Sequence, residues 1–294
     1  MADQWFKVSI CICTRNRPNE LECALVSLFG STVRPHEVIV SDDSTDFRTR
    51  ELIRNLFPEV QYLEGPRKGL CSNRNVALNG ATGTHILFID DDVVLGADFL
   101  HQVQGQLTAV DSKEREQLIV TGLERRNGHI VYPHDQSFLG YQRKVYRPAD
   151  KMKTIVINST VFPAGLFTKM QFDDQLRYGY DEVDLTTRAV EQGYQIRLCE
   201  AAINDHFPSE VNRDYYKTVI EASRIFVTFK RYFFSERRKL KGLVFFALAV
   251  MHAGAHALFR QGRRGPAQFW QTMKEVLLYT RNHRKRAVTG GESL

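Results

Sequence analysis

The feature that most constrains this chain is a short apolar run that ends in three adjacent carboxylates. Residues 85–89 read His-Ile-Leu-Phe-Ile, a composition typical of a buried strand, and Asp90, Asp91 and Asp92 follow directly. Adjacent carboxylates repel one another, so we expect a cation to offset their charge, either a divalent metal ion or a cluster of Arg and Lys side chains. The alternative is an acidic turn that water solvates.

The chain before this run alternates between strand and helix patterns. Strand-helix-strand alternation predicts an α/β fold with a doubly wound, mostly parallel sheet flanked by helices. Thr45 or Asp46 is the expected N-cap of the second helix. The predicted strands are 7–13, 37–41 and 60–63, and the predicted helices are 18–29, 47–57 and 72–79.

A second acidic pair follows another predicted strand. Asp42 and Asp43 come directly after residues 37–41. The carboxyl ends of parallel strands share one edge of a sheet, so Asp42 and the three carboxylates ending at Asp92 are expected to face one crevice. Oxygen ligands at such an edge suit Mg²⁺ or Mn²⁺, which retain water and take substrate phosphates as further ligands.

The chain from residue 93 to residue 209 continues the alternating pattern. Residues 124–153 have weak periodicity and are expected to form a loop over the crevice, a usual place for acceptor recognition. His206 is expected in a polar turn after the last strand. The predicted helices here are 98–110 and 182–192, and the predicted strands are 118–123, 154–158 and 194–199.

Positive charge is concentrated in the last third of the chain. The 294 residues carry a net charge of +6, but residues 210–294 hold 17 Lys and Arg against 6 Asp and Glu. Residues 1–209 hold 23 against 28. This asymmetry predicts two regions, 1–209 and 210–294, and a polyanionic partner for the second, either an anionic membrane or a nucleic acid.

The basic region contains apolar and amphipathic helix patterns. Helices are predicted at 215–234 and 269–279, with a basic tail at 281–286, and residues 243–259 contain no Asp, Glu, Lys or Arg. This run is short for a membrane span, which needs ~20 apolar residues, and basic residues flank both of its ends. We favour helices that lie on an anionic membrane surface. The alternatives are a true span, or a buried helix that packs internally or joins two copies in a homo-oligomer.

The first residues and the cysteines indicate the cytoplasm. The first residues have no charged segment followed by an apolar one, so no secretion signal is expected. The five cysteines show no CxxC pairing and are expected to be reduced thiols, mostly buried. The expected location is cytoplasmic, peripheral on the inner face of the cell membrane.

Four segments together resemble a family 2 glycosyltransferase with the GT-A fold. Residues 8–17 resemble the first strand of that family and its Thr/Asn-Arg loop, and residues 38–46 are similar to its VDDGSTD stretch. Residues 69–92 resemble its G…RN…A.G…FLDDD run, which contains the DXD motif, and residues 181–185 resemble its ED.DL segment. Each segment alone is a weak signal, whereas the four in this order, across residues 6–207, are a strong one.

The resemblance implies an inverting, metal-dependent hexosyltransferase of polysaccharide biosynthesis. Its donor would be a nucleotide diphosphate sugar, with a UDP-sugar favoured, its acceptor a glycan or lipid-linked saccharide, and its cofactor Mg²⁺ or Mn²⁺. The residues expected to contact the donor or its nucleotide are Thr14, Arg15, Asp42, Lys68, Arg74, Asp90 and Asp91. The expected metal ligands are Asp92, Asp90 and His206.

Several of these residues also have a purely structural interpretation. Lys68 and Arg74 could be solvated loop charges, Asp42 could form an N-cap or Asx turn, and His206 could be a structural histidine. Ser41 stands where the family often has an Asp. Asp42 is therefore the position expected to meet the nucleotide base.

The catalytic base is expected in the pair Asp181-Glu182 at the start of a helix. The family has Glu before Asp here, and this chain reverses the order, so both residues remain candidates, with Glu182 favoured. Either carboxylate could instead complement the helix dipole, and Asp184 is expected to support the helix start. One base without a covalent partner implies a single displacement with inversion.

Two other functions fit parts of the sequence. A nucleotidyltransferase would also hold a metal with carboxylates, but its phosphate loop should be rich in glycine, and residues 14–18 contain none. A basic nucleic-acid-binding or scaffold protein would use the last third of the chain. That function leaves the acidic clusters unexplained, because they repel phosphates, and we therefore expect no nucleic-acid partner.

Overall fold

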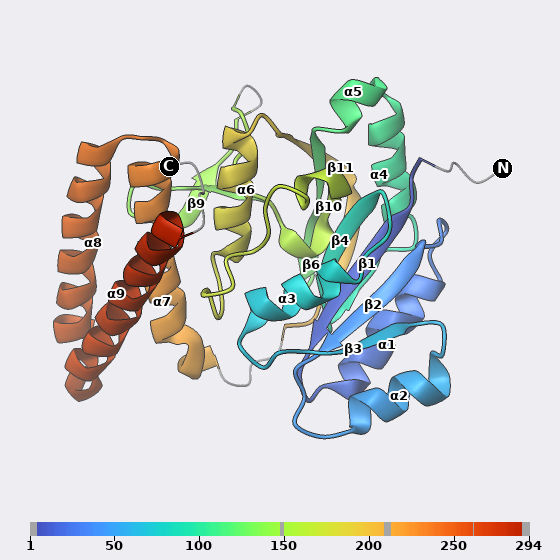
Figure 1. Ribbon diagram of the computed structural model, residues 1–294, viewed down its shortest axis with the longest axis horizontal. Coiled ribbons are helices and arrows are strands. Elements are labelled where there is room, and N and C mark those ends of the chain that lie inside the picture. The colour runs from blue at the N-terminus through green and yellow to red at the C-terminus, as the bar shows by residue number, and fades with distance from the viewer. Residues whose placement is uncertain (1–4, 148–149, 209–212, 261, 290–294) are drawn as a thin grey trace.

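The structure is a computed structural model that describes residues 5–147, 150–208, 213–260 and 262–289. Figure 1 shows a twisted sheet with helices on both of its faces, and the long helices α7, α8 and α9 stand together at one end of the molecule. The predicted α/β class with a mostly parallel sheet is confirmed.

The first half of the sheet is parallel. Its strands lie in the order β3-β2-β1-β4, and each pairs in parallel with its neighbour. Every residue of β1 is buried, as expected for a strand that helices cover on both sides. The elements are β1 (Val8–Thr14), α1 (Pro18–Phe29), β2 (Glu37–Asp42), α2 (Arg48–Leu56), β3 (Gln61–Glu64), α3 (Leu70–Asn79) and β4 (His85–Asp90).

The second half of the sheet is mixed. Strand β10 runs antiparallel to both β4 and β6, and β11 runs parallel to β6. Strands β6 and β11 therefore point in the same direction as β1 to β4, and the carboxyl ends of all six strands lie at one edge. The elements are β5 (Val93–Val94), β6 (Leu118–Arg126), β7 (His129–Val131), β10 (Thr160–Pro163) and β11 (Gln195–His206).

The strand register brings the two acidic clusters to either side of β1. Thr14, the last residue of β1, is opposite Asp42 of β2, and Cys13 is opposite Asp90 of β4. Both clusters therefore lie at the same edge of the sheet, as the alternating pattern predicts.

Helices cover the two faces of the sheet with separate hydrophobic cores. Helices α1, α2 and α4 contribute to one core, and α3 and α6 to the other. Helices α7, α8 and α9 share the second core with the sheet, and the division between residues 209 and 210 stays a prediction. The remaining elements are α4 (Phe99–Thr108), α5 (Ser112–Arg115), η1 (Ile157–Ser159), η2 (Ala164–Leu166), α6 (Asp181–Glu191), α7 (Arg213–Lys230), η3 (Arg231–Ser235), α8 (Lys239–Arg260), η4 (Gly262–Arg264) and α9 (Gly265–Thr289).

The strand predicted at residues 154–158 is wrong. Residues 157–159 form a short 3₁₀ turn, and the strand begins only at Thr160, which pairs with Thr121 of β6. The amide of Val156 donates instead to the side-chain Oγ1 of Thr121 at 3.2 Å. The apolar pair at 155–156 is buried without being part of the ladder.

The prediction of a plain loop at residues 124–153 is also wrong in part. This segment contains the end of β6, all of β7 and a hairpin of β8 (His134–Gln136) and β9 (Gln142–Val145). Contacts with α7 support the hairpin: Gln136 Nε2 donates to Thr228 Oγ1 at 3.0 Å, and Arg224 donates to the carbonyl oxygen of Leu139. Because single contacts with α7 support the hairpin, its strands do not need the alternation of apolar and polar residues by which a strand is recognised in the sequence.

Three smaller expectations also need correction. His206 is the last residue of β11, paired with Arg126, and does not lie in a turn. Residues 281–286 continue α9, and His283 within them packs against the ring of Phe226 from α7. The N-cap position of α2 is Phe47.

Candidate active site

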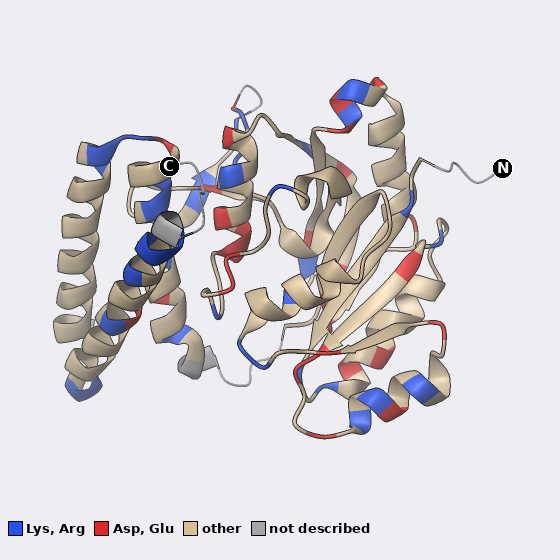
Figure 2. Ribbon diagram, in the orientation of Figure 1, with Lys and Arg blue, Asp and Glu red and all other residues tan. Residues whose placement is uncertain are grey.

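Thr14 connects the two acidic clusters at the end of β1. Its hydroxyl donates to Asp91 Oδ2 at 2.8 Å, and its carbonyl oxygen accepts from the amide of Asp43 at 2.9 Å. A single residue between β2 and β4 thus fixes the distance between the clusters. Figure 2 marks acidic residues in red, and they occur both at the strand ends and at the start of α6.

Asp42 is buried and hydrogen-bonded through both carboxylate oxygens. Its Oδ1 accepts from the amide of Ser44 at 2.8 Å, which is an Asx turn, and its Oδ2 accepts from the hydroxyl of Tyr62 at 3.0 Å. The structural interpretation of Asp42 therefore holds in this structure, and its contact with a nucleotide base stays a prediction.

Arg17 binds the carboxylates of Asp91 and Asp92 together. Its Nη1 lies 2.7 Å from Asp91 Oδ1 and 3.0 Å from Asp92 Oδ2. Burial raises the pKa of Asp91 to about 7, although Arg17 and Thr14 act in the opposite direction. Part of the cationic charge that the three carboxylates require therefore comes from an arginine.

His206 lies between Asp92 and Glu124. Its Nε2 is 3.2 Å from Asp92 Oδ1, and its Nδ1 is 2.9 Å from Glu124 Oε2. Burial alone would lower the pKa of His206, but its bonds to the two carboxylates outweigh burial and raise the pKa to about 9. Asp92 Oδ1 is buried and has no well-aligned hydrogen bond.

The residues at this edge fit a hydrated divalent cation in part. No group of three or more His, Cys, Asp or Glu side chains is already arranged as a ligand set in the described chain. However, the unsatisfied Asp92 Oδ1 and the adjacent His206 Nε2 could bind one ion together, and Asp90 uses only its Oδ1 to contact Arg74. Two or three protein ligands with several waters suit Mg²⁺ or Mn²⁺.

Arg74 joins the end of β4 to the start of α6. The guanidinium is buried and bonds to Asp90 at 3.0 Å and to the carboxylate of Asp181. Burial raises the pKa of Asp181 despite the positive charge of Arg74. Arg74 is therefore not a solvated loop charge, and its direct contact with a phosphate stays a prediction.

Of the two candidate bases, Glu182 is the one that Arg74 does not bind. Its side chain is half-buried, and burial together with the charge of Asp181 raises the pKa of Glu182 to about 7. The side chain of Gln142 from β9 lies close enough to Glu182 to oppose this rise in pKa. The chain enters α6 through Gly179 and Tyr180, which both have positive φ, at 78° and 63°. A non-glycine residue in this region is under backbone strain, and strain of this kind is frequent at functional sites.

Comparison with known proteins identifies the family. The model of the family described as "Glycosyl transferase family 2" matches residues 9–163, which is more than half of the chain. The chain belongs to glycosyl transferase family 2. The transferase activity that the four motifs predict is thereby supported at the level of the family.

Several relatives of this family 2 glycosyltransferase come from bacteria. The succinoglycan biosynthesis protein ExoM of Rhizobium meliloti is 32% identical over 107 residues, which are 34% of each chain. GalNAc(5)-diNAcBac-PP-undecaprenol beta-1,3-glucosyltransferase of Campylobacter jejuni is 33% identical over 95 residues, which are 29% of each chain. The uncharacterized glycosyltransferase YwdF of Bacillus subtilis is 26% identical over 61% of this chain and 63% of its own. The chain thus spans less than two thirds of each of these relatives.

Solved structures of TarS from S. aureus share the fold. Two such structures superpose with a TM-score of 0.61 at 17% and 18% identity, and each match covers 93% of this chain. The match covers 49% of the longer TarS chain and 80% of the chain of residues 1–349. The GT-A fold implied by the four motifs is confirmed.

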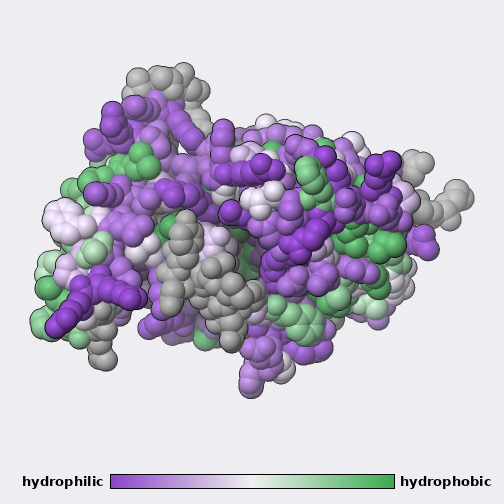
Figure 3. Space-filling view, turned by 90° about the horizontal axis from the view of Figure 1, so that it is seen from below, coloured by the Kyte–Doolittle hydropathy of each residue, from purple (hydrophilic) through white to green (hydrophobic). Residues whose placement is uncertain are grey.

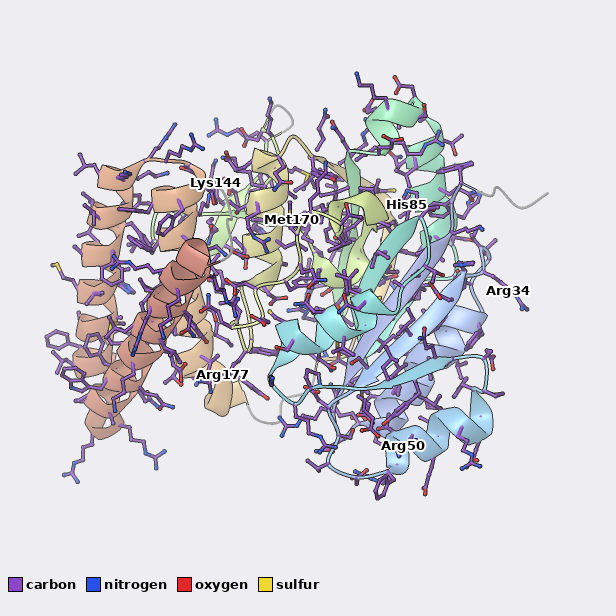
Figure 4. The ribbon with its side chains drawn as sticks, in the orientation of Figure 1. Arg34, Arg50, His85, Lys144, Met170 and Arg177 are labelled. Atoms are coloured by element: carbon purple, nitrogen blue, oxygen red, sulfur yellow. The ribbon has the colours of Figure 1, made fainter. Side chains whose placement is uncertain are left out.

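The remaining predicted residues of the glycosyltransferase are exposed basic side chains beside the acidic edge. Arg15 and Lys68 are exposed, and neither forms an ion pair with another described residue. Gly69 follows Lys68 with a φ of 112°, and a Cβ there would lie 2.8 Å from Arg177 Cα. Glycine at this position lets the basic loop pass close to the segment that leads into α6. Figure 4 labels Arg177, which forms an ion pair with Glu275 of α9 at 2.6 Å.

The sequence interpretation of the glycosyltransferase misses two residues of the site. Arg17 is one of two arginines in the loop after β1, and the resemblance to the family indicates only the other, Arg15. Glu124 directly follows the strand predicted at 118–123, so the rule that located Asp42 and Asp90 applies to it equally. Asp184 is held by Arg188 and Lys230, both at 2.8 Å, which agrees with its expected supporting role.

Proposed function

We propose that this chain transfers a sugar from a nucleotide diphosphate sugar, with a UDP-sugar favoured, to a hydroxyl group of a glycan or lipid-linked saccharide, with inversion. Membership of the family supports glycosyl transfer. The observation that carries the finer proposal is the position of Thr14, which bonds to both acidic clusters at the carboxyl edge of the sheet.

On the donor side, we assign protein residues to the base, to the diphosphate and to the cation. Asp42 would accept a hydrogen bond from the base, and the exposed Arg15 and Lys68 would neutralise phosphate charge. Asp92 and His206 would hold Mg²⁺ or Mn²⁺, assisted by Asp90. When bound, the cation would supply Lewis-acid stabilisation of the charge on the leaving diphosphate.

The acceptor side of the proposal assigns the general base to Glu182. Asp181 is bonded to the buried Arg74 and is only 3% exposed, so an acceptor hydroxyl has less access to it than to Glu182. Glu182 is half-buried, and its pKa near 7 suits a base that operates at neutral pH. It would take the proton of the acceptor hydroxyl as that oxygen attacks the anomeric carbon. The leaving diphosphate departs from the opposite face, which inverts the configuration.

A panel of nucleotide sugars tests this proposal. Metal-dependent thermal stabilisation or slow hydrolysis should appear with one donor, and Asp92→Ala should abolish the response to metal. Glu182→Gln should keep donor binding and lose transfer. If Glu182→Gln transfers sugar at the normal rate, the general base is Asp181. If no donor produces a response, the proposed activity is contradicted.

The acceptor and the location are proposed from the surface of the C-terminal helices. The stretch Lys239–Phe259 of α8 is long and apolar enough to cross a membrane, by length and composition, and 22% of its most apolar window is buried. Helices α8 and α9 expose large apolar side chains. These are Leu240, Leu243, Val244, Leu248, Met251, Leu258 and Phe259 on α8, and Trp270, Leu277 and Leu278 on α9.

The same helices carry positive charge beside the apolar residues. Figure 3 shows this end of the molecule from below, with hydrophobic and hydrophilic residues interspersed. Lys239 and Arg263 lie near opposite ends of α8, and Phe245 and Ala249 bury its inner side against the neighbouring helices. A helix with one packed side and an exposed apolar side suits a membrane surface better than a span.

We therefore propose a peripheral location on an anionic, cytoplasmic membrane face and a lipid-linked saccharide as acceptor. The name of the Campylobacter relative refers to an undecaprenol-linked saccharide, which supports the acceptor class. Flotation with anionic vesicles should recover the full chain at low salt and lose it at high salt. Recovery that salt does not reduce would favour a span, and no recovery at low salt would contradict the membrane proposal. Self-association through these helices is the other use of the surface, and light scattering without lipid would detect it.

A further inference from the structure

Glu124 is a buried carboxylate at the carboxyl end of β6. Its side chain is 2% exposed, and three side chains direct donors at its two oxygens. His206 and Arg126 contact Oε2, at 2.9 Å and 2.7 Å, and Asn158 Nδ2 donates to Oε1 at 3.1 Å. A buried charge of this kind is costly unless such partners offset it, so its position needs a specific explanation.

The contact with His206 fixes which nitrogen of the ring faces the active site. An ionised carboxylate only accepts hydrogen bonds, so the proton of the contact belongs to His206 Nδ1. The other nitrogen, Nε2, then faces Asp92 Oδ1 at 3.2 Å, and it must release its own proton when a cation binds there. Arg126 also lies 3.2 Å from Nδ1, but its shorter contact is with Glu124.

The other oxygen of Glu124 connects it to the acidic run. Asn158 donates to Glu124 Oε1 and accepts, through its own Oδ1, from the amide of Asp90 at 3.0 Å. A chain of polar contacts therefore runs from Asp90 through Asn158, Glu124 and His206 to Asp92. These contacts tie the ends of β4, β6 and β11 together behind the proposed cation.

We infer that Glu124 is a positioning residue that holds the ring of His206 with Nε2 directed at a divalent cation beside Asp92. The inference rests on the metal site of the proposed function. A carboxylate behind a ligating histidine fixes the ring orientation and tautomer, and its removal typically weakens metal binding about 10-fold to 100-fold.

Substitution of Glu124 by Gln keeps the shape of the side chain but removes one acceptor. Three donors converge on Glu124, and a Gln amide must direct its own NH₂ group at one of them. Whichever way the amide turns, the acceptor that holds His206 Nδ1 loses its negative charge or is replaced by a donor, so the ring is held less firmly. We expect Glu124→Gln to raise the dissociation constant of Mn²⁺ alone, measured from the EPR signal of the free ion, about 10-fold or more.

Arg126→Met provides the matched control from the same cluster. Arg126 is 42% exposed at its side chain and contacts Glu124 without touching Asp92. Its approach to His206 Nδ1 at 3.2 Å brings two donors together once Nδ1 carries a proton, so it does not hold the ring. If Glu124 acts through His206, Arg126→Met should change Mn²⁺ affinity no more than about twofold. An equal loss in both variants would mean that Glu124 serves as the counter-ion of Arg126, and it would overturn the inference.

A double-mutant cycle with His206→Ala separates positioning from a general charge effect. When His206 is absent, Glu124→Gln should weaken Mn²⁺ binding no further, because the contact on which it acts is gone. A further loss of about tenfold on that background would overturn the inference. If Glu124→Gln does not fold, as judged by its thermal unfolding, Glu124→Asp retracts the carboxylate from Nδ1 while it keeps the charge, and the same outcomes apply.

The wild-type titration separates failure of the inference from failure of the metal assignment. If the wild-type chain binds no Mn²⁺, the metal site of the proposed function is wrong and the role of Glu124 fails with it. If the wild-type chain binds Mn²⁺ and Glu124→Gln binds it equally well, only the inference about Glu124 is overturned.

Discussion

Arg74 forms a buried ion pair with Asp181, which lies 107 residues further along the chain. Each side chain is only 3% exposed. The pair joins α3 to the first turn of α6, and Arg74 also bonds to Asp90 at the end of β4. The candidate base next to Asp181 and the acidic run are therefore held by one guanidinium.

Replacement of Arg74 by Met should lower the free energy of unfolding by about 3 kcal/mol or more. The substitution leaves the carboxylate of Asp181 buried without a partner, which is strongly destabilising. Urea unfolding measures the change. The double variant Arg74→Met/Asp181→Asn removes the unpaired charge and should recover part of the stability but not the transferase activity. A single variant as stable as the wild-type chain would contradict the structural role of the pair.

The transfer rate should decrease as the pH falls below about 7. The pKa of Glu182 is raised to about 7 by burial and by the charge of Asp181, so the side chain becomes protonated as pH falls and can no longer accept the proton of the acceptor. A pH profile of kcat at saturating donor measures this. Glu182→Gln should lower kcat about 100-fold or more and leave residual activity without the acidic limb.

Asp91 offers a second explanation for a decrease in kcat at acidic pH, because burial raises the pKa of Asp91 to about 7 as well. If the limb persists in Glu182→Gln, its origin is Asp91 or another donor-side group, and the base assignment is wrong. Donor binding measured across the same pH range separates the two residues, because Asp91 lies on the donor side.

The sequence predicts the parallel half of the sheet correctly, because each strand and helix there has its own local pattern of apolar residues. Strands β1 to β4 are apolar runs separated by helices with their own period, and strand order alone brings Asp42 and Asp90 together. The hairpin of β8 and β9 was not predictable in this way, because its support comes from α7. In the site, Arg17 and Glu124 find their partners 74 and 82 residues away, and no local pattern records such contacts.

His85 should contribute a loss of stability as the pH falls from 7 to 5, opposed by Asp91, Glu182 and His206, whose raised pKa values stabilise the folded chain over the same range. Burial, with a smaller effect from Arg115, lowers the pKa of His85 to about 4. The unfolded chain therefore binds a proton below about pH 6.5 that the folded chain excludes until about pH 4. The resulting loss is about 2 kcal/mol between pH 7 and pH 5.

His85→Gln isolates this contribution from those of the carboxylates. His85 packs beside Phe6, with ring centroids 5.1 Å apart, and hydrogen-bonds to Thr84 Oγ1, far from the acidic edge. Urea unfolding should show that the free energy of unfolding of the variant, taken relative to the wild-type chain, is about 2 kcal/mol higher at pH 5 than at pH 7. An equal change with pH in both chains would mean that His85 accepts its proton in the folded state.

Leu243→Glu should weaken binding to anionic vesicles about tenfold or more. Leu243 is 56% exposed on the apolar side of α8, and the loss of one leucine contact with the lipid is worth about 1.5 kcal/mol or more. Leu56→Glu is the matched control, because Leu56 is 57% exposed but lies on α2, away from the C-terminal helices. Both variants add the same negative charge, so a general electrostatic effect would weaken both equally. Vesicle flotation at low salt measures the difference, and equal binding of the two variants would exclude the apolar side of α8 as the membrane contact.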